Sequence, residues 1–213
     1  ALDAGNYTVT VVNDGTVNIT GSSASADFTV NKAKSAVNST NVTEVYGVDP
    51  IINVNSVNAS SVIVVVLDAN EVIVYSNDSA LANGSVAIPI SLDVGVYKVN
   101  LTTAPINGNY SAAFKQYTLT VIKANSTIII SEIDNVTYSN PTVINFTVYN
   151  DTSVNWTILN KETGNVIPGS GLANISSVLD AGNYTIAIEN ANTSNINRFL
   201  ASADFTVNKA NAS

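Results

Sequence analysis

The sequence LDAGNYT at residues 2–8 returns unchanged at residues 179–185. A second block, ASADFTVNKA at residues 24–33, returns unchanged at residues 201–210. Across residues 2–33, 21 of 32 positions are identical to those 177 residues later, and no gap is needed to align them. A duplication this close indicates that the chain is built from repeated structural units.

A looser third copy lies between these two, with LDVGVY at residues 92–97 and YTLTVIKA at residues 117–124. The motif Asp-x-Gly-x-Tyr therefore begins at Asp3, Asp93 and Asp180, in steps of 90 and then 87 residues. A fixed period of this size is typical of tandem domains. We expect a partial first repeat, a complete middle repeat and a complete last repeat. Their predicted boundaries are residues 1–33, 34–124 and 125–213.

The first repeat holds only the last two strands of such a domain, too few to fold independently. We therefore expect the chain to be an excerpt of a longer parent, in which about five strands precede Ala1 and a copy of residues 36–124 follows Ser213. The junctions at residues 32–35 and 123–126 contain no Gly/Ser-rich or Pro-rich linker. This excludes a flexible coil and predicts domains arranged as a semi-rigid rod.

Polar and apolar residues alternate with a period of two at residues 6–11, 144–148 and 154–158, which predicts half-buried β-strands. No segment shows a sustained helical period. The fold class that follows is all-β, with tandem immunoglobulin-like β-sandwich domains of about seven strands each. The expected strands lie near residues 37–46, 51–57, 61–68, 71–76, 85–91, 96–103 and 117–123 in the middle repeat, and near 126–131, 142–149, 153–160, 165–168, 173–178, 183–189 and 202–208 in the last repeat.

Two Asn-Gly pairs, Asn83-Gly84 and Asn107-Gly108, predict tight hairpin turns of type I′. Both residue types tolerate the positive φ angles that this turn requires at its two central positions.

Tyr7, Tyr97 and Tyr184 each follow the motif aspartate by four residues, at the start of the predicted sixth strand. Immunoglobulin-like domains keep a tyrosine corner there, in which the hydroxyl bonds to nearby backbone. Trp156 falls on the third strand, where the core tryptophan of such domains lies, so we predict that Trp156 belongs to the core. Aromatic residues are common in strands in any case. However, the tyrosine recurs at the same position of all three repeats, which favours the tyrosine corner.

The motif LDAGNYT, the strand ending FTVNKA and the Val45-Tyr46-Gly47 stretch of the middle repeat carry a family resemblance. Over nearly its whole length the chain resembles the Ig-like (Big-type) repeats of adhesin-like surface proteins from methanogenic archaea, relatives of bacterial Ig-like domains. Such repeats serve mostly as stalks, so the resemblance implies a spacer role. The last repeat departs from the pattern, with VTYSN at residues 136–140 where Tyr-Gly is expected.

Composition argues against catalysis. The chain contains no His and no Cys, which removes the commonest general base and any thiolate metal site or disulfide. Its serines have no partner base, no Gly-rich phosphate loop occurs, and Asp3, Asp93 and Asp180 recur once per repeat as turn-capping residues. We expect no enzyme activity. The net charge of −8 argues against nucleic acid and anionic membranes as partners. No apolar run approaches the length of about 20 residues that membrane insertion needs.

Asparagine is the most distinctive residue: 18 of the 31 asparagines lie in Asn-x-Ser/Thr sequons. These N-glycosylation candidates are Asn6, Asn18, Asn38, Asn41, Asn58, Asn77, Asn83, Asn100, Asn109, Asn125, Asn135, Asn145, Asn150, Asn155, Asn174, Asn183, Asn192 and Asn211. Nine of them have an apolar middle residue and fall on predicted strands: Asn6, Asn18, Asn41, Asn100, Asn135, Asn145, Asn155, Asn174 and Asn183.

One interpretation of these sequons is a by-product, since a strand whose wet face uses Asn and Thr creates sequons automatically. However, Asn forms strands poorly, and here it replaces the charged residues, which are only 11% of the chain. Because so uncharged a surface would be prone to association, we expect a coat of N-linked glycans that adds solubility and protects sheet edges. A calcium ion near residues 44–49 or 132–134 is a weaker alternative cofactor, since oxygen ligands are abundant there, although neither place has a loop of clustered, regularly spaced acids.

Three functions remain open. The first is a glycosylated stalk segment of a large extracellular, cell-surface adhesin-like protein. Its partners would be neighbouring repeats of the same chain, and other domains would bind other cells or surface glycans. The second is a structural segment of an extracellular filament or sheath. The third is a carbohydrate-binding module, for which only Tyr75, Tyr110, Tyr149 and Phe199 look free to form an aromatic platform.

Overall fold

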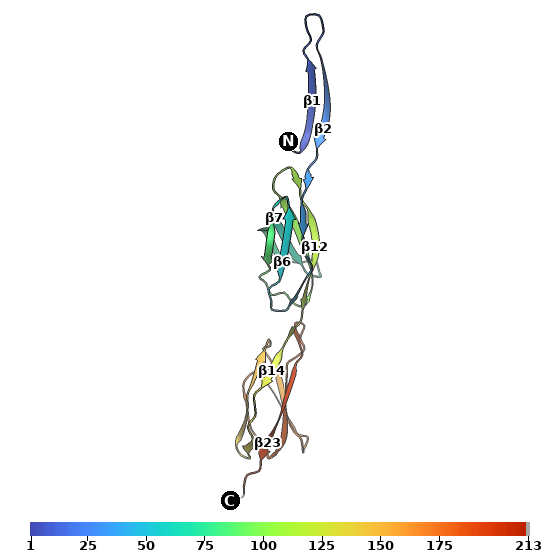
Figure 1. Cartoon of the computed structure of the whole chain (residues 1–213). Coiled ribbons are helices and arrows are strands. Elements are labelled where there is room, and N and C mark those ends of the chain that lie inside the picture. The colour runs from blue at the N-terminus through green and yellow to red at the C-terminus, as the bar shows by residue number, and fades with distance from the viewer. Residues whose placement is uncertain (212–213) are drawn as a thin grey trace. The chain divides into compact units, whose positions relative to one another are not determined.

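The computed structural model describes residues 1–211, which form strands, turns and loops without a helix (Figure 1). The all-β prediction is therefore confirmed for this part of the chain. No helix in it is long and apolar enough to cross a membrane.

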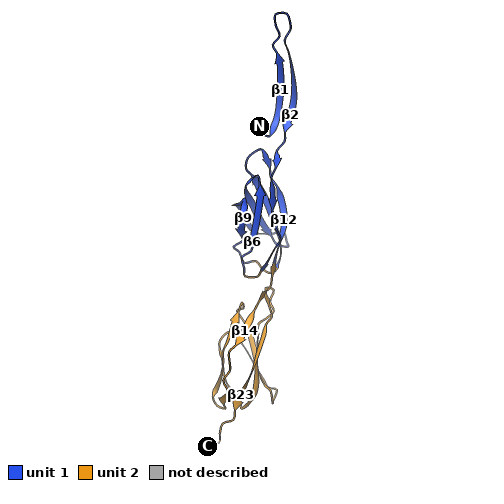
Figure 2. Cartoon of the chain, in the orientation of Figure 1, with its two compact units in different colours: residues 1–44, 48–91, 95–120 blue, residues 45–47, 92–94, 121–213 orange. Residues whose placement is uncertain are grey.

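The chain divides into two compact units, coloured separately in Figure 2. Unit 1 contains residues 1–44, 48–91 and 95–120. Unit 2 contains residues 45–47 and 92–94 together with the described part of the chain from residue 121 onward.

Unit 1 begins with a two-stranded antiparallel hairpin, β1 (Gly5–Asn13) and β2 (Ser22–Val30), paired from Gly5 with Val30 to Asn13 with Ser22. The rings of Tyr7 and Phe28 stack on it with centroids 5.5 Å apart. Their counterparts in unit 2, Tyr184 and Phe205, stack in the same way at 5.4 Å. Phe28 is 43% exposed and Phe205 only 4%, because a complete core encloses Phe205 and no other described strands cover the hairpin.

The rest of unit 1 is a β-sandwich. One sheet has the strand order β4-β6-β9 and the other β5-β12-β10-β7-β8, while β3 and β11 form a short parallel pair. The strands are β3 (Ala33–Lys34), β4 (Ala36–Asn38), β5 (Val42–Val45), β6 (Ile51–Val57), β7 (Ala59–Leu67), β8 (Ile73–Leu81), β9 (Asn83–Ala87), β10 (Gly95–Pro105), β11 (Tyr110–Ser111) and β12 (Phe114–Ile122).

Alternation of side chains places the core between these two sheets. In β6, every second residue is buried, with Ile52 and Val54 facing inward between exposed neighbours. In β7, Val62, Val64 and Val66 are fully buried, while the residues between them are half-buried. β-branched residues suit these positions because they pack well on a pleated, buried face.

Unit 2 is a second β-sandwich, which also has a five-stranded main sheet. Its main sheet has the order β15-β23-β21-β18-β19, and two antiparallel pairs, β14-β17 and β16-β20, close the core from the other side. The strands are β13 (Ala124–Asn125), β14 (Thr127–Ile130), β15 (Val136–Thr137), β16 (Pro141–Ile144), β17 (Phe146–Tyr149), β18 (Asn155–Asn160), β19 (Val166–Ser170), β20 (Ile175–Val178), β21 (Gly182–Glu189), β22 (Ile196–Asn197) and β23 (Leu200–Asn208).

Trp156 lies on β18, the strand where the sequence places it, but at the margin of the core. Its side chain is half-buried and packs against the buried cluster that includes Ile158 and Ile186. The indole lies over Gly169 of the edge strand β19, where a Cβ atom would come within 2.0 Å of the ring. The prediction that Trp156 belongs to the core is thus corrected to a place at the margin of the core, because an edge strand with a glycine leaves the ring partly open to solvent.

The prediction of type I′ turns at the two Asn-Gly pairs is wrong. Asn83 and Gly84 lie inside β9, which pairs with β6 rather than with the preceding strand β8. Asn83 Oδ1 instead accepts a hydrogen bond from the Ser56 N–H at 2.8 Å. Neither Asn107 nor Gly108 has a positive φ.

The tyrosines of the repeated motif bond to the backbone of their own turn. Tyr7 Oη donates to the Asp3 carbonyl oxygen at 2.7 Å, and Tyr184 Oη donates to the Asp180 carbonyl oxygen at 2.8 Å. This is the geometry expected of a tyrosine corner. Tyr97 occupies the same place in unit 1 and is buried.

We predict that Tyr184→Phe lowers the free energy of unfolding of unit 2 by about 1 kcal/mol, because it removes the hydroxyl that satisfies the Asp180 carbonyl. Urea titration followed by the fluorescence of Trp156, the single tryptophan of the chain, measures this change in unit 2 alone. Tyr149→Phe is the control, since the exposed Tyr149 hydroxyl bonds to no described residue. Equal midpoints for the two variants would contradict a stabilising corner.

Candidate functional site

The sequons are the first candidate site, and all 18 of their asparagines are at least partly accessible. Asn58, Asn77, Asn100 and Asn109 are half-buried, and the other fourteen are exposed. Two asparagines of the described chain, Asn160 and Asn190, are buried, and both lie outside sequons. Burial therefore excludes Asn160 and Asn190 from modification and excludes none of the sequon asparagines.

The strand sequons follow the alternation that the sequence predicts. In Asn145-Phe146-Thr147, the phenylalanine is buried between two exposed polar residues. Asn18 is the exception to this alternation, and the prediction that places it on a strand is wrong. It lies in the loop between β1 and β2, followed by Ile19, which is 61% exposed. The strand prediction is also corrected at Asn41, Asn135, Asn145 and Asn174, each of which lies directly before a strand.

A glycan attaches at the amide nitrogen, and in four sequons that nitrogen already donates a hydrogen bond. Asn58 Nδ2 donates to the Lys34 carbonyl oxygen and Asn150 Nδ2 to the Asn125 carbonyl oxygen. The remaining two are Asn109 and Asn183. Asn58 and Asn150 also share a left-handed backbone, with φ of 59° and 60°. These asparagines have structural roles that compete with modification.

Asn183 is bound by a carboxylate of a neighbouring turn. Both its N–H and its Nδ2 donate to Glu162, the Nδ2 bond being 2.7 Å long. The Asn183 N–H holds the pKa of the Glu162 carboxyl below its usual value, because it stabilises the charged form. On the neighbouring strand, Lys161 Nζ, followed by the Thr185 hydroxyl, lowers the pKa of Asp204.

A second candidate site is a polar joint within unit 1. Asn109, in the loop between β10 and β11, reaches the turn of the first repeat. Its Nδ2 donates to Asp3 Oδ1 at 2.7 Å, and its Oδ1 accepts from the Ala4 N–H at 2.7 Å. Its carbonyl oxygen also accepts from the Ala33 N–H at 2.8 Å. One asparagine therefore holds both the turn and the outgoing strand of the first repeat.

Unit 2 contains the same arrangement. Asn195 Nδ2 donates to Asp93 Oδ1 at 2.7 Å, and its Oδ1 accepts from the Val94 N–H at 2.9 Å. The Asn195 carbonyl oxygen accepts from the Ala124 N–H at 3.0 Å. We refer to this set of three hydrogen bonds as the asparagine clasp.

Sequence reasoning missed the clasp. It treats Asn109 only as a glycosylation candidate and assigns no role to Asn195. A signal was present, because Asn18 and Asn195 are aligned and identical in the two closely matching copies, and Thr16 and Ile19 are conserved around them in Thr193 and Ile196.

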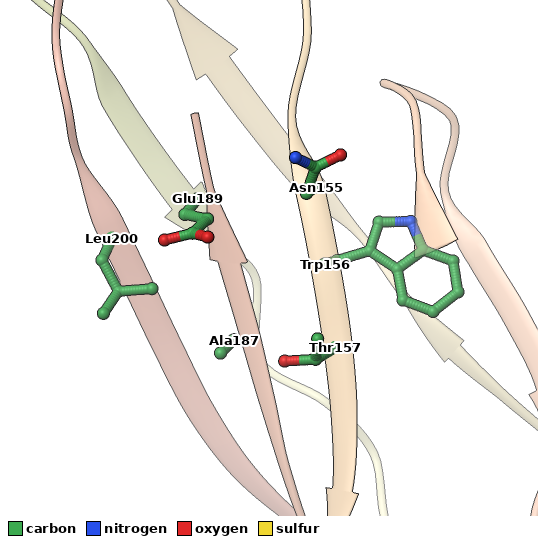
Figure 3. A pocket seen from close by; sticks show the side chains of 6 residues that line it. All are labelled: Asn155, Trp156, Thr157, Ala187, Glu189 and Leu200. Carbon is green, nitrogen blue, oxygen red and sulfur yellow. The ribbon is translucent and has the colours of Figure 1, made fainter. Parts of the chain in front are cut away.

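A hollow of about 150 Å³ lies on the main sheet of unit 2 (Figure 3). Side chains from β18, β21 and β23 line it, and the ring of Trp156 turns away from Glu189 and Leu200. Glu189 is paired with Arg198. The hollow combines a paired carboxylate, two short polar side chains, Asn155 and Thr157, and apolar surface, and it contains no nucleophile with an adjacent base.

Only two of the four aromatic residues predicted to form the platform of a carbohydrate-binding module are exposed. Tyr149 and Phe199 are exposed, but Tyr75 and Tyr110 are half-buried. Phe114 and Tyr138, which the sequence does not single out, are exposed by 59% and 45%. The recorded ring stacks among described residues are the two Tyr–Phe pairs of the repeated motif.

Within residues 1–211, no three or more Asp and Glu side chains gather into a possible metal site. Calcium, which can also use backbone oxygens, stays a prediction from the sequence.

Comparison with protein families and with curated proteins finds no match. Solved structures with a similar fold do occur. A tetra-tandem repeat from the extending region of a large adhesion protein is 20% identical, covering 97% of this chain and 57% of that one, with a TM-score of 0.40. Fibronectin(III)-like modules of Clostridium thermocellum CbhA are 16% identical over 82% of this chain and 95% of that one, with a TM-score of 0.34.

Two fibronectin type III domains of chicken tenascin are 10% identical, covering 81% of this chain and 98% of that one, with a TM-score of 0.39. The likeness to these modules and adhesin repeats is one of fold.

We predict that Glu162→Gln destabilises unit 2 at neutral pH, because a neutral amide accepts hydrogen bonds from Asn183 more weakly than a carboxylate does. Since the folded pKa of Glu162 is lowered, its contribution is present above the ordinary carboxyl pKa of 4.5 and is lost as the pH falls through the lower folded value. Urea midpoints read from Trp156 fluorescence should therefore converge for wild type and variant as the pH falls below the lowered pKa of Glu162.

Glu132→Gln is the matched control, since Glu132 is exposed and bonds to no described residue. A difference between wild type and Glu162→Gln that is independent of pH would show that the charge on Glu162 is not responsible.

Proposed function

We propose that this chain is a non-catalytic, glycosylated stalk segment of a large repetitive cell-surface protein, with Ig-like repeats of the Big type found in archaeal adhesin-like proteins. The observation that carries the proposal is the division of the asparagines. Every sequon asparagine is accessible, and the two buried asparagines of residues 1–211 lie outside sequons.

Such a surface suits an extracellular spacer. The exposed strand faces use Asn and Thr in place of charged residues. Uncharged polar groups therefore hydrate this surface, and neighbouring chains repel one another only weakly. Bulky, solvated glycans at these positions would keep neighbouring chains apart and would block pairing at the exposed edges of the sheets. The clasp supports the spacer role, because in unit 1 it joins the first repeat directly to the middle repeat without a linker.

We predict that glycans occupy Asn145, Asn155 and Asn174 and leave Asn109 and Asn183 unmodified. The first three amides are exposed and bond to no described residue, whereas the other two already donate through Nδ2. Mass spectrometry of glycopeptides from protein made by its native cells measures occupancy. Thr157→Ala is the control that removes the sequon of Asn155 while keeping the asparagine itself. Unmodified asparagine at all three exposed positions would contradict a glycan coat.

The spacer role predicts thin, separate rods tethered to the cell in electron micrographs of detergent-free material sheared from the surface of producing cells. Antibodies against this segment would mark the rods along their length, away from their distal ends. Ordered filaments with a fixed axial repeat and lateral contacts between these domains would instead show a filament or sheath component and overturn the stalk proposal.

A further inference from the structure

The asparagine clasp has two halves that each occur three times in the chain. The first half is the Asp-x-Gly-x-Tyr turn, which offers a carboxylate and the N–H of the next residue. The second half is a short loop that offers an asparagine. The turn begins at Asp3, Asp93 and Asp180, and the loop asparagine is Asn18, Asn109 or Asn195.

The three loops have related local structures. The N–H of Asn195 donates to Thr193 Oγ1 at 3.3 Å, and that of Asn18 donates to Thr16 Oγ1 at the same distance. In the loop of Asn109, the side chain of Asn107 replaces the threonine and accepts at 2.9 Å. A side chain two residues upstream therefore fixes each loop before any partner is present.

Two of the three turns are bound by a loop asparagine, and the third turn is open. The Asp3 carboxylate accepts a hydrogen bond from Asn109, and the Asp93 carboxylate accepts one from Asn195. No hydrogen bond from another described residue reaches the Asp180 carboxylate, and the Ala181 N–H donates to none. The Tyr184 hydroxyl nevertheless holds the Asp180 carbonyl as Tyr7 holds that of Asp3, so the open turn is already in the corner geometry of the occupied one.

We propose that the turn and the loop are the two halves of a docking element between repeats, and that Asp180 and Ala181 form an open half whose partner is the asparagine-bearing loop of a further Ig-like repeat of this kind. The inference rests on the proposed function, which supplies further repeats in the same parent protein. The partner loop is recognised by its chemistry: an asparagine at its third position, preceded two residues earlier by Thr or Asn.

Asparagine suits this position because the turn presents an acceptor and a donor side by side. One amide group satisfies both, with Nδ2 facing the carboxylate and Oδ1 facing the N–H. Aspartate would place two carboxylates together, and alanine would leave both groups of the turn without a partner. The carbonyl oxygen of the same asparagine binds the outgoing strand, at Ala33 in unit 1 and at Ala124 in unit 2. Turn and strand are thereby held by one residue.

Hydrogen exchange of single amides tests the docking element in the chain as it stands. Val94 and Ala181 occupy the same position of the same turn, one clasped and one open. We expect the protection factor of the Val94 N–H to exceed that of Ala181 by about tenfold, as one net hydrogen bond between neutral groups implies. Asn195→Ala should remove this excess, whereas Asn192→Ala, in the same loop but bonded to Lys123, should preserve it. Equal protection of Val94 and Ala181 in the wild type would overturn the proposal.

A chain extended after Ala210 by a copy of residues 34–124 tests the open half directly. The natural junction is preserved, because Lys209-Ala210 repeats Lys32-Ala33. Protection of the Ala181 N–H should rise to the level of Val94, and Asn109→Ala within the appended copy should abolish the rise. An unchanged Ala181 beside an appended repeat whose own core amides are protected would overturn the proposal. Neither measurement involves glycans or cells, so its failure is distinct from failure of the stalk function.

Discussion

The hydrogen bond from the motif tyrosine to the carbonyl of its own turn is the constraint on which the rest of the structure depends. Tyr184 is buried in the core of unit 2, and its hydroxyl holds the backbone of Asp180 four residues upstream. The start of β21 is thereby tied to the turn that precedes it. The tyrosine uses only the Asp180 carbonyl, so the exposed Asp180 carboxylate and the Ala181 N–H remain available for a further partner. The bond that completes the core thus also shapes the docking surface.

The core consists mainly of aliphatic side chains, which the alternation along each strand places on the inward face. β7 places Val62, Val64 and Val66 on its inward face, and β6 of the other sheet contributes the buried Ile52 and Val54. Because the strand period decides which residues face water, the same alternation puts Asn and Thr outside. The surface has few charges because Asn and Thr, and not charged residues, fill the outward positions. Many sequons can therefore occur along the strands without any change to the buried residues.

The sequence predicted the architecture well where a signal repeats, either within a strand or from one domain repeat to the next. Alternation located most strands, and the recurrence of Asp-x-Gly-x-Tyr identified the corner. Single residues were less informative. Asn83-Gly84 carries a strong hairpin signal, but pairing of β9 with β6 in the other sheet overrides it. The depth of Trp156 depends on Gly169, which lies opposite it on β19, and no local pattern shows that pairing.

The clasp could not be predicted from local patterns, because its partners are 106 residues apart in unit 1 and 102 apart in unit 2. Only the tertiary structure shows that Asn109 uses its amide on Asp3. That assignment changes the meaning of its sequon: the nitrogen that a glycan would need is the one that binds the carboxylate. Asn195 makes the same contact with Asn197 in place of the Ser or Thr of a sequon. Because the clasp forms at Asn195 without a sequon, its hydrogen bonds and not modification account for asparagine at position 195.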